Sequence, residues 1–263
     1  MSSANLSRLS RSLAATEDTS AAGARSLASE LRSPPLAPVA ARAHEVPDLA
    51  ELAEVSKSFE NAPASSVVAW AWERYGDSLV LAMSGQDCVL LDMAIRVALD
   101  IEVVFLDTQY HFPETLEYVE SLRERYSLNL TITHPEVEPD DRWKTDPDGC
   151  CQVRKIDPLA HALEGKSAWM TGLRRSEAPT RAKAPIVSYD VGKGLVKVNP
   201  LATWTDLDVE GYGRDRNLPV HPLREQGYVS IGCWPCTQPV GDDEHARAGR
   251  WAGTDKIECG LHG

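Results

Sequence analysis

Short apolar runs alternate with helix-like segments through the middle of the chain, and this alternation constrains the fold more than any other feature. The apolar runs are SLVLAMSG (78–85), IEVVFLDT (101–108), NLTITHP (129–135) and SAWMTGLRR (167–175). Segments such as QDCVLLDMAIRVAL and PETLEYVESLRERYS lie between them and have the pattern of helices. Strands that alternate with helices form parallel sheets covered by helices. The sequence therefore predicts an α/β fold with a doubly wound, mostly parallel sheet.

Three polar segments directly follow predicted strands and mark an expected ligand site. They are SGQD (84–87), DTQYHF (107–112) and TGLRRSEAPTRA (171–182). In doubly wound sheets, ligands bind outside the carboxyl ends of the strands. SGQD also precedes a predicted helix, whose free N–H groups can bind an anion. A turn of small residues before a helix is common, so SGQD alone is weak evidence for an anion site. Its expected position beside the other two loops strengthens that interpretation.

The rest of the chain divides into three predicted parts. Residues 1–45 are rich in Ser, Ala and Pro and are predicted to be a low-complexity, disordered arm. Residues 46–240 form the predicted α/β domain and open with two amphipathic helices, and residues 241–263 form a C-terminal tail. No apolar run is long enough to span a membrane, and the start lacks the apolar core of a secretory signal. We expect a cytoplasmic protein, with an organelle as the alternative.

The overall charge argues against a nucleic-acid partner. The formal net charge is −12 and the pI is about 5.1, whereas nucleic-acid binding favours a basic face. Arginines nevertheless gather near one predicted strand end and near the C-terminus, and paired arginine donors suit phosphate or sulfate. The residues concerned are Arg174, Arg175, Arg181, Arg247 and Arg250. The last two are three residues apart, which predicts that they share one helical face; a solvated charged surface is the alternative.

Four of the six cysteines have the pattern of a metal centre. Cys150 and Cys151 are adjacent, and Cys233 and Cys236 form a CxxC pair. Four such thiolates suffice for one centre, and buried thiols or a redox disulfide are the alternative. Neighbouring side chains point apart, which suits the separate irons of a 4Fe–4S cluster better than one tetrahedral zinc ion. Lys155 follows Cys151 by four positions and could tune such a centre electrostatically.

The remaining two cysteines have different predicted roles. Cys88 begins an apolar helix and is expected in the core. Cys259 lies four residues from the C-terminus, with Lys256 and His262 each three residues away. A thiolate near cationic groups has a lowered pKa and is a better nucleophile. Cys259 is therefore a candidate nucleophile, unless it is a stray thiol on a frayed end.

These motifs together resemble one enzyme family. The ending ECGLH, the CC…RK segment, GYVSIGCWPCT and TGLRRSEAPTRA are similar to the assimilatory sulfonucleotide reductases, specifically the bacterial iron–sulfur adenosine 5′-phosphosulfate (APS) reductases. The resemblance covers about residue 65 to the end. It implies the adenine-nucleotide alpha-hydrolase-like fold with a mobile C-terminal tail. It also implies that Cys259 attacks the sulfur of APS, expels AMP and becomes S-sulfocysteine, from which thioredoxin or a similar dithiol releases sulfite.

The same resemblance assigns the remaining site residues. Cys150, Cys151, Cys233 and Cys236 match the ligands of a 4Fe–4S cluster, beside which Lys155 would help to polarise the sulfate group. Substrate contacts are implied for Ser84, Gly85, Asp107, Thr108, Lys155, Arg174, Arg175, Arg181, Arg247, Arg250 and His262. A homo-oligomer is compatible with the resemblance.

Two positions and one loop depart from the family pattern, and three other functions remain open. Gln109 stands where the family usually has glycine, Ile257 stands where threonine is common, and SGQD differs from the commoner loops. The first alternative is a reductase of 3′-phosphorylated APS (PAPS), alone or together with APS, but dedicated PAPS enzymes generally lack the four cysteines. A nucleotide-binding module with structural zinc would leave Cys259 without chemistry. An ATP-dependent adenylating enzyme of the same fold would not need ECGLH.

Overall fold

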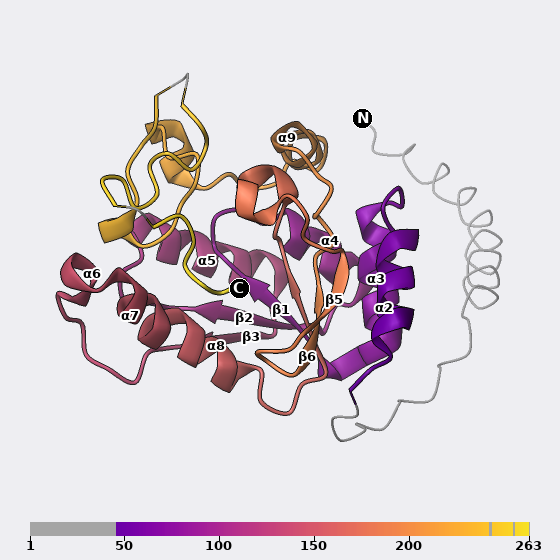
Figure 1. Ribbon diagram of the computed structural model, residues 1–263. Helices are drawn as coiled ribbons and strands as arrows, with labels where there is room; N and C mark the ends of the chain where they lie inside the picture. Colours follow the sequence, from indigo (N-terminus) through magenta and orange to yellow (C-terminus); the bar gives the residue numbers. More distant parts are fainter. Residues whose placement is uncertain (1–45, 242–243, 255, 263) are drawn as a thin grey trace, which may run out of the picture. The chain divides into compact units, whose positions relative to one another are not determined.

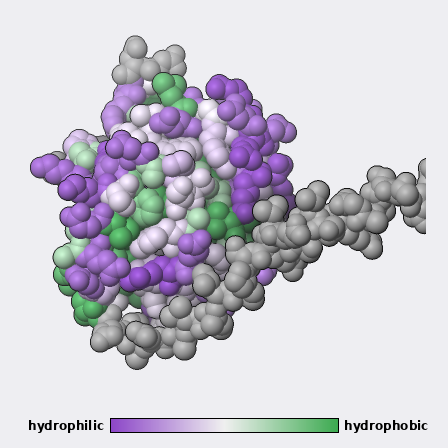
Figure 2. Space-filling view, turned by 90° about the vertical axis from the view of Figure 1, so that its right-hand side faces the viewer, coloured by the Kyte–Doolittle hydropathy of each residue, from purple (hydrophilic) through white to green (hydrophobic). Residues whose placement is uncertain are grey.

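The computed structural model describes residues 46–241, 244–254 and 256–262 (Figure 1). The arm predicted over residues 1–45 lies outside the described residues. Within the described part, no helix is both long enough and apolar enough to cross a membrane. Figure 2 shows a face of the molecule on which hydrophilic residues dominate and hydrophobic ones lie in small groups. Small groups of exposed apolar residues are ordinary on folded proteins.

A six-stranded sheet forms the centre of the fold, in the order β3-β2-β1-β4-β6-β5. The strands are β1 (Leu79–Met83), β2 (Glu102–Leu106), β3 (Leu130–Thr133), β4 (Ala168–Thr171), β5 (Val187–Asp190) and β6 (Leu195–Val198). All neighbouring pairs are parallel except β5 and β6, which are antiparallel. The predicted parallel sheet is therefore confirmed, while the β5–β6 hairpin at its edge was not predicted.

Alternating residues of the strands supply two separate cores. In β1, Leu79 and Leu81 face the larger core, and Val80 faces the smaller one. Helices α3 (Ala64–Tyr75), α4 (Val89–Val97), α5 (Pro113–Tyr126) and α9 (Asp206–Asp215) contribute to the larger core, and α8 (Asp157–Ala162) to the smaller (Figure 1). The two-residue period of a strand produces this division. Cys88 is 2% exposed in the larger core, which confirms its predicted place.

The edge hairpin is held to the domain by helix α2 (Leu49–Ser58). The Asp48 carboxylate accepts hydrogen bonds from the N–H groups of Ala50 and Glu51 and so caps this helix. Near the other end, the buried Ser56 hydroxyl accepts hydrogen bonds from the N–H groups of Ile186 and Val187, at 3.0 and 3.2 Å. A side chain of α2 thus satisfies two backbone donors where β5 begins.

One helix expected from the sequence does not form. Residues 246–249 form turns, so Arg247 and Arg250 do not share a helical face. The backbone there pairs instead with the CxxC segment, through Gln238 N–H to Gly249 O at 2.9 Å and Trp251 N–H to Cys236 O at 3.0 Å. A Cβ atom at position 249 would collide with the Gln238 carbonyl. This pairing fixes the second cysteine pair against the tail.

Replacing Ser56 by alanine tests the attachment of α2 to β5. The change leaves two buried N–H donors without a partner, so we expect the free energy of unfolding to fall by about 1–3 kcal/mol. Ser58→Ala is the matched control, because Ser58 is exposed and its hydroxyl donates to Val55 O within the same helix. Urea denaturation of both variants measures the difference, and equal stability of the two would contradict this account.

Candidate active site

Two distant segments bring four cysteines to one small pocket. Helix α7 (Pro147–Cys151) carries Cys150 and Cys151 at its end, and the 3-10 helix η6 (Trp234–Cys236) follows Cys233 and ends at Cys236. The Asp146 carboxylate caps α7 by accepting the Gly149 N–H at 2.9 Å. All four thiols line the pocket, together with aromatic and proline side chains and Lys155. None of them is in a disulfide.

The electrostatics of this pocket suit thiolates only when a positive charge compensates them. Burial raises the pKa of Cys150, Cys151 and Cys236, and that of Cys151 reaches about 11. The described residues contain no group of three or more His, Cys, Asp or Glu side chains arranged to hold one metal ion. The structure shows that the four thiols line one shared pocket.

Residues 152–156 form one turn of π-helix between α7 and α8. Such wide turns are rare and are frequent at functional sites. This turn carries Lys155, which lines both the cysteine pocket and the larger cavity beside it. It also carries Arg154, which is 1% exposed and lies over the Tyr110 ring with its guanidinium carbon 4.4 Å from the ring centroid.

The conformation and contacts of Gln109 explain how glutamine replaces the glycine that is usual in the family. Its φ angle is +65°, in the left-handed region where glycine is the usual residue. The loop therefore has a glycine-like backbone at this position. The Gln109 side chain adds an acceptor for Arg154, whose Nη1 donates to Oε1 at 2.6 Å. The substitution thus keeps the backbone and adds a contact to the helical segment beside the cysteines.

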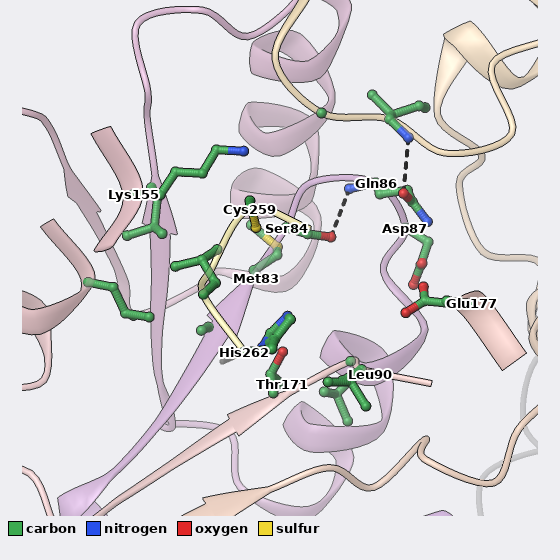
Figure 3. Close-up of a pocket in the computed structure, with 18 of the residues that line it drawn as sticks. Met83, Ser84, Gln86, Asp87, Leu90, Lys155, Thr171, Glu177, Cys259 and His262 are labelled. Atoms are coloured by element: carbon green, nitrogen blue, oxygen red, sulfur yellow. Dashed lines mark hydrogen bonds between the residues drawn. The ribbon is translucent and has the colours of Figure 1, made fainter. Parts of the chain in front are cut away.

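The larger cavity has a volume of about 180 Å³ and lies at the carboxyl ends of β1, β2 and β4 (Figure 3). One water molecule needs roughly 10–15 Å³, so this space fits a larger ligand. Its wall combines residues of three predicted loops with residues of the C-terminal tail. The predicted site residues that lie in this wall are Ser84, Thr108, Lys155, Arg181, Arg247, Arg250, Cys259 and His262. The cavity lies where ligands usually bind in doubly wound sheets, at the carboxyl ends of the strands, as the sequence predicted.

The loop after β1 is shaped by Gly85 and tied to the CxxC segment. Gly85 has a φ of +72°, and a Cβ atom there would lie 3.1 Å from Phe105. Ser84 Oγ accepts the Gln86 N–H at 3.3 Å, and Gln86 Oε1 accepts the Ile231 N–H at 3.0 Å (Figure 3). Gly85 does not line the cavity. It allows the close packing that presents Ser84 to it.

The loop after β2 contacts the cysteine pocket through Thr108. This residue is 1% exposed, and its Oγ1 lies 3.3 Å from Cys233 Sγ. Asp107 lies outside the cavity wall; its carboxylate accepts the Gln109 N–H at 2.9 Å and faces His134 Nδ1 at 3.5 Å. Thr108 therefore belongs to the site directly, and Asp107 shapes the loop.

Cys259 projects into the cavity from the tail, on the same side as Lys155 (Figure 3). Burial raises the pKa of this thiol, but the Lys155 ammonium, the Leu261 N–H and the Arg250 guanidinium outweigh that effect. The pKa of Cys259 is therefore lowered, and more of it is thiolate at neutral pH. A lowered pKa of this origin is typical of a nucleophilic cysteine.

The cations near Cys259 are not those that its sequence neighbours suggested. Burial and the charges of Lys197 and Arg181 hold the pKa of His262 well below its usual value, so its ring is neutral. That ring stacks on Trp169 with centroids 6.0 Å apart. Lys256 is paired with Asp148. Folding, rather than chain proximity, therefore supplies the positive charge beside the thiol.

The arginines of the predicted anion loop divide into two groups. Arg175 makes a two-pronged ion pair with Glu60, with both distances 2.7 Å, and Arg174 bonds to Asp206 at 2.6 Å. Neither lines the cavity, so the structure does not bring them to the predicted site. Arg181 and Arg247 do line it, but both are paired with carboxylates.

Lys155 and Arg250 are the cations left for an anionic ligand. Within the described residues, neither forms an ion pair with a carboxylate. In the part of the chain that the structure describes, Arg250 Nη1 donates to Ser230 Oγ and Ile231 O, both at 3.4 Å. A Cβ atom at position 232 would collide with the Arg250 guanidinium, so Gly232 makes room for it. The site therefore places two unpaired positive charges next to a thiolate.

Comparison with known proteins identifies the family of the chain. Residues 78–239 match the phosphoadenosine phosphosulfate reductase domain. The adenosine 5′-phosphosulfate reductase of Mycolicibacterium smegmatis is 44% identical over 224 residues, and that of Streptomyces coelicolor is 43% identical over 225 residues. Each alignment covers 82% of this chain and 95% of the relative. The chain belongs to the sulfonucleotide reductase family, of the adenosine 5′-phosphosulfate reductase type.

Solved structures agree with this assignment. The phosphate complex of a Candida auris PAPS reductase is similar with a TM-score of 0.66 and 25% identity, and covers 75% of this chain and all of the other. A Candida glabrata FMN adenylyltransferase, at 15% identity and a TM-score of 0.53, shares the fold and covers 75% of this chain and 76% of its own. The predicted nucleotide alpha-hydrolase-like fold is confirmed.

Arg250→Gln tests the electrostatic account of Cys259. Removing this guanidinium takes away a charge that lowers the thiol pKa, so we expect the pKa to rise and the alkylation rate at neutral pH to fall several-fold. The measurement is the pH dependence of iodoacetamide labelling at Cys259, read by peptide mass spectrometry. Arg142→Gln is the control, because Arg142 belongs to helix α6 (Arg142–Thr145) outside the cavity wall. An unchanged pH profile in Arg250→Gln would contradict the account.

Proposed function

We propose that this protein reduces adenosine 5′-phosphosulfate to sulfite and AMP with thioredoxin or a similar dithiol as reductant. The observation that carries the proposal is the lowered-pKa thiol of Cys259 inside a cavity that also presents Lys155 and Arg250. The similarity to enzymes named adenosine 5′-phosphosulfate reductase supplies the substrate class. Free thiols of this kind persist in a reducing compartment, so we propose the cytoplasm as the location.

In the first step, the Cys259 thiolate attacks the sulfur atom of the substrate. A bond forms between Sγ and that sulfur, the bond from sulfur to the bridging phosphate oxygen breaks, and AMP leaves with the electron pair. The enzyme retains S-sulfocysteine. We expect Lys155 and Arg250 to neutralise the sulfate oxygens, because both act electrostatically on the Cys259 thiol. Preorganised charges of this kind stabilise a transition state without reorganisation.

In the second step, one thiolate of the reductant attacks Cys259 Sγ. The bond between Sγ and the sulfonate sulfur breaks, sulfite leaves with the electron pair, and a mixed disulfide forms. The second thiol of the reductant then resolves this disulfide and regenerates Cys259. A protein reductant must reach the sulfur atom, so the tail has to leave the cavity between the two steps.

Cys150, Cys151, Cys233 and Cys236 are the residues that we propose hold a 4Fe–4S cluster. They line one shared pocket, and the side chains of the adjacent residues Cys150 and Cys151 point apart, which suits a centre with several irons better than a single zinc ion. When bound, such a cluster supplies a concentrated charge beside the sulfate-binding residues. Lys155 lines both spaces and links them electrostatically.

The choice of APS over PAPS is supported by the relatives, which are named adenosine 5′-phosphosulfate reductases. The four cysteines support it as well, because dedicated PAPS enzymes generally lack them. Competition between APS and PAPS measures the preference, and we expect APS to be favoured.

The mechanism predicts a covalent adduct on one thiol. Anaerobic protein incubated with APS alone should gain one sulfonate group, which non-reducing peptide mapping locates on Cys259. Thioredoxin and its reductant should then remove the group and release sulfite. Cys259→Ser should form no adduct, and Cys88→Ala is the control that should retain it. An unmodified Cys259 in protein that retains its metal would overturn the proposal.

The proposed cluster predicts iron and acid-labile sulfide in equal amounts. Anaerobically purified protein should contain both and absorb visible light, and Cys233→Ser should lose both. Cys88→Ala, which removes a core thiol instead, should keep them. Metal analysis distinguishes the two centres. One zinc ion per chain without iron would contradict the cluster and indicate a single-ion site.

A further inference from the structure

Glu258, directly before Cys259, joins the tail to the domain through several ionic contacts. Its carboxylate accepts from Arg181 Nε at 2.7 Å and Nη2 at 2.6 Å, from Arg247 Nη2 at 3.2 Å and from Thr180 Oγ1 at 3.1 Å. The side chains of Arg181, Arg247 and Glu258 are only 9%, 13% and 22% exposed. Ionic hydrogen bonds shielded from water in this way are stronger than surface pairs.

The other end of the tail is anchored by apolar contacts. Leu261 packs against the smaller core, and the His262 ring stacks on Trp169. Lys193 Nζ also donates to Leu261 O at 3.2 Å. Cys259 therefore lies between two attachments, an ionic one on its N-terminal side and an apolar one on its C-terminal side. The position of its sulfur atom depends on both.

We propose that Glu258 is a positioning residue that holds Cys259 at the cavity, and that Arg181 and Arg247 act on the tail through it. This inference rests on the proposed function for the role of Cys259. The charge balance supports it: Arg181 also pairs with Glu177, but among the described residues Glu258 is the carboxylate that bridges Arg181 and Arg247. Without that carboxylate, their mutual repulsion would oppose docking. While the tail is docked, anionic groups of a substrate find their unpaired cations at Lys155 and Arg250.

Glu258→Gln tests the inference in substrate-free protein. The amide keeps the shape of the side chain but removes its charge, so we expect hydrogen exchange in the C-terminal peptide to accelerate about tenfold, as the loss of a charged hydrogen bond implies. Glu244→Gln is the matched control. Glu244 is an exposed tail residue whose Oε2 accepts the Gly241 N–H at 2.8 Å, and an amide oxygen can replace it. Equal exchange in both variants would overturn the proposal.

A double-mutant cycle asks whether Glu258 and Arg247 act together. If they form one unit, Glu258→Gln combined with Arg247→Gln should accelerate exchange little beyond the faster single variant. Fully multiplicative effects would show that the two residues act independently and would contradict the proposal. Iron content and the thermal transition of each variant identify any that fail to fold.

Single-turnover kinetics separate the positioning role from the proposed reaction. In Glu258→Gln we expect the S-sulfonate adduct on Cys259 to form at least several-fold more slowly, while the pH dependence of its formation is kept. Slower chemistry with unchanged tail exchange would contradict positioning and leave the reductase function intact. If wild-type protein forms no adduct, the proposed function fails, and the exchange experiment still decides whether Glu258 docks the tail.

Discussion

The ammonium group of Lys155 is the charge on which both halves of the site depend. It lines the four-cysteine pocket and the ligand cavity, and within the described residues it forms no ion pair with a carboxylate. A charge removed from water is costly unless nearby groups compensate it. Burial lowers the pKa of Lys155, but the thiolates of Cys233 and Cys259 more than reverse this effect and raise it. The lysine therefore couples the metal-binding side of the molecule to its nucleophile.

The fold could be predicted where one local pattern decided the outcome. Apolar runs of strand length between amphipathic segments predicted the parallel sheet, and the sheet predicted the edge at which the site lies. The β5–β6 hairpin was not predicted, because a short turn rather than a helix joins its two strands and the prediction relied on strands that alternate with helices. The helix expected near Arg247 does not form, since the backbone of that segment pairs with the CxxC segment. Local periodicity cannot anticipate hydrogen bonds made with a distant strand-like segment.

The site was predictable in its residue types and less so in its pairings. Cysteine spacing and the tail motif pointed to Cys259 and to the four-cysteine pocket, all of which the structure places beside Lys155. Chain proximity suggested His262 as a cation, yet folding buries it against Trp169 and keeps it neutral. Arg175 was grouped with its neighbours, but its partner Glu60 lies 115 residues away. Such pairings are set by tertiary structure, which spacing does not encode.

The π-helical turn at residues 152–156 has a consequence for the permitted length of the chain. Cys150 and Cys151 face the cysteine pocket on one side of this turn, and Leu159 faces the smaller core on the other. An α-helical turn holds about 3.6 residues, and the wider π-helical turn holds about one more. The wide turn thus takes up one extra residue while the helical segments on its two sides keep their directions. Deleting that residue would let the turn close into an α-helix, and the side chains within it, Lys155 among them, would shift. The extra residue therefore sets where Lys155 points, and its loss should disturb this cation more than the packing of Leu159.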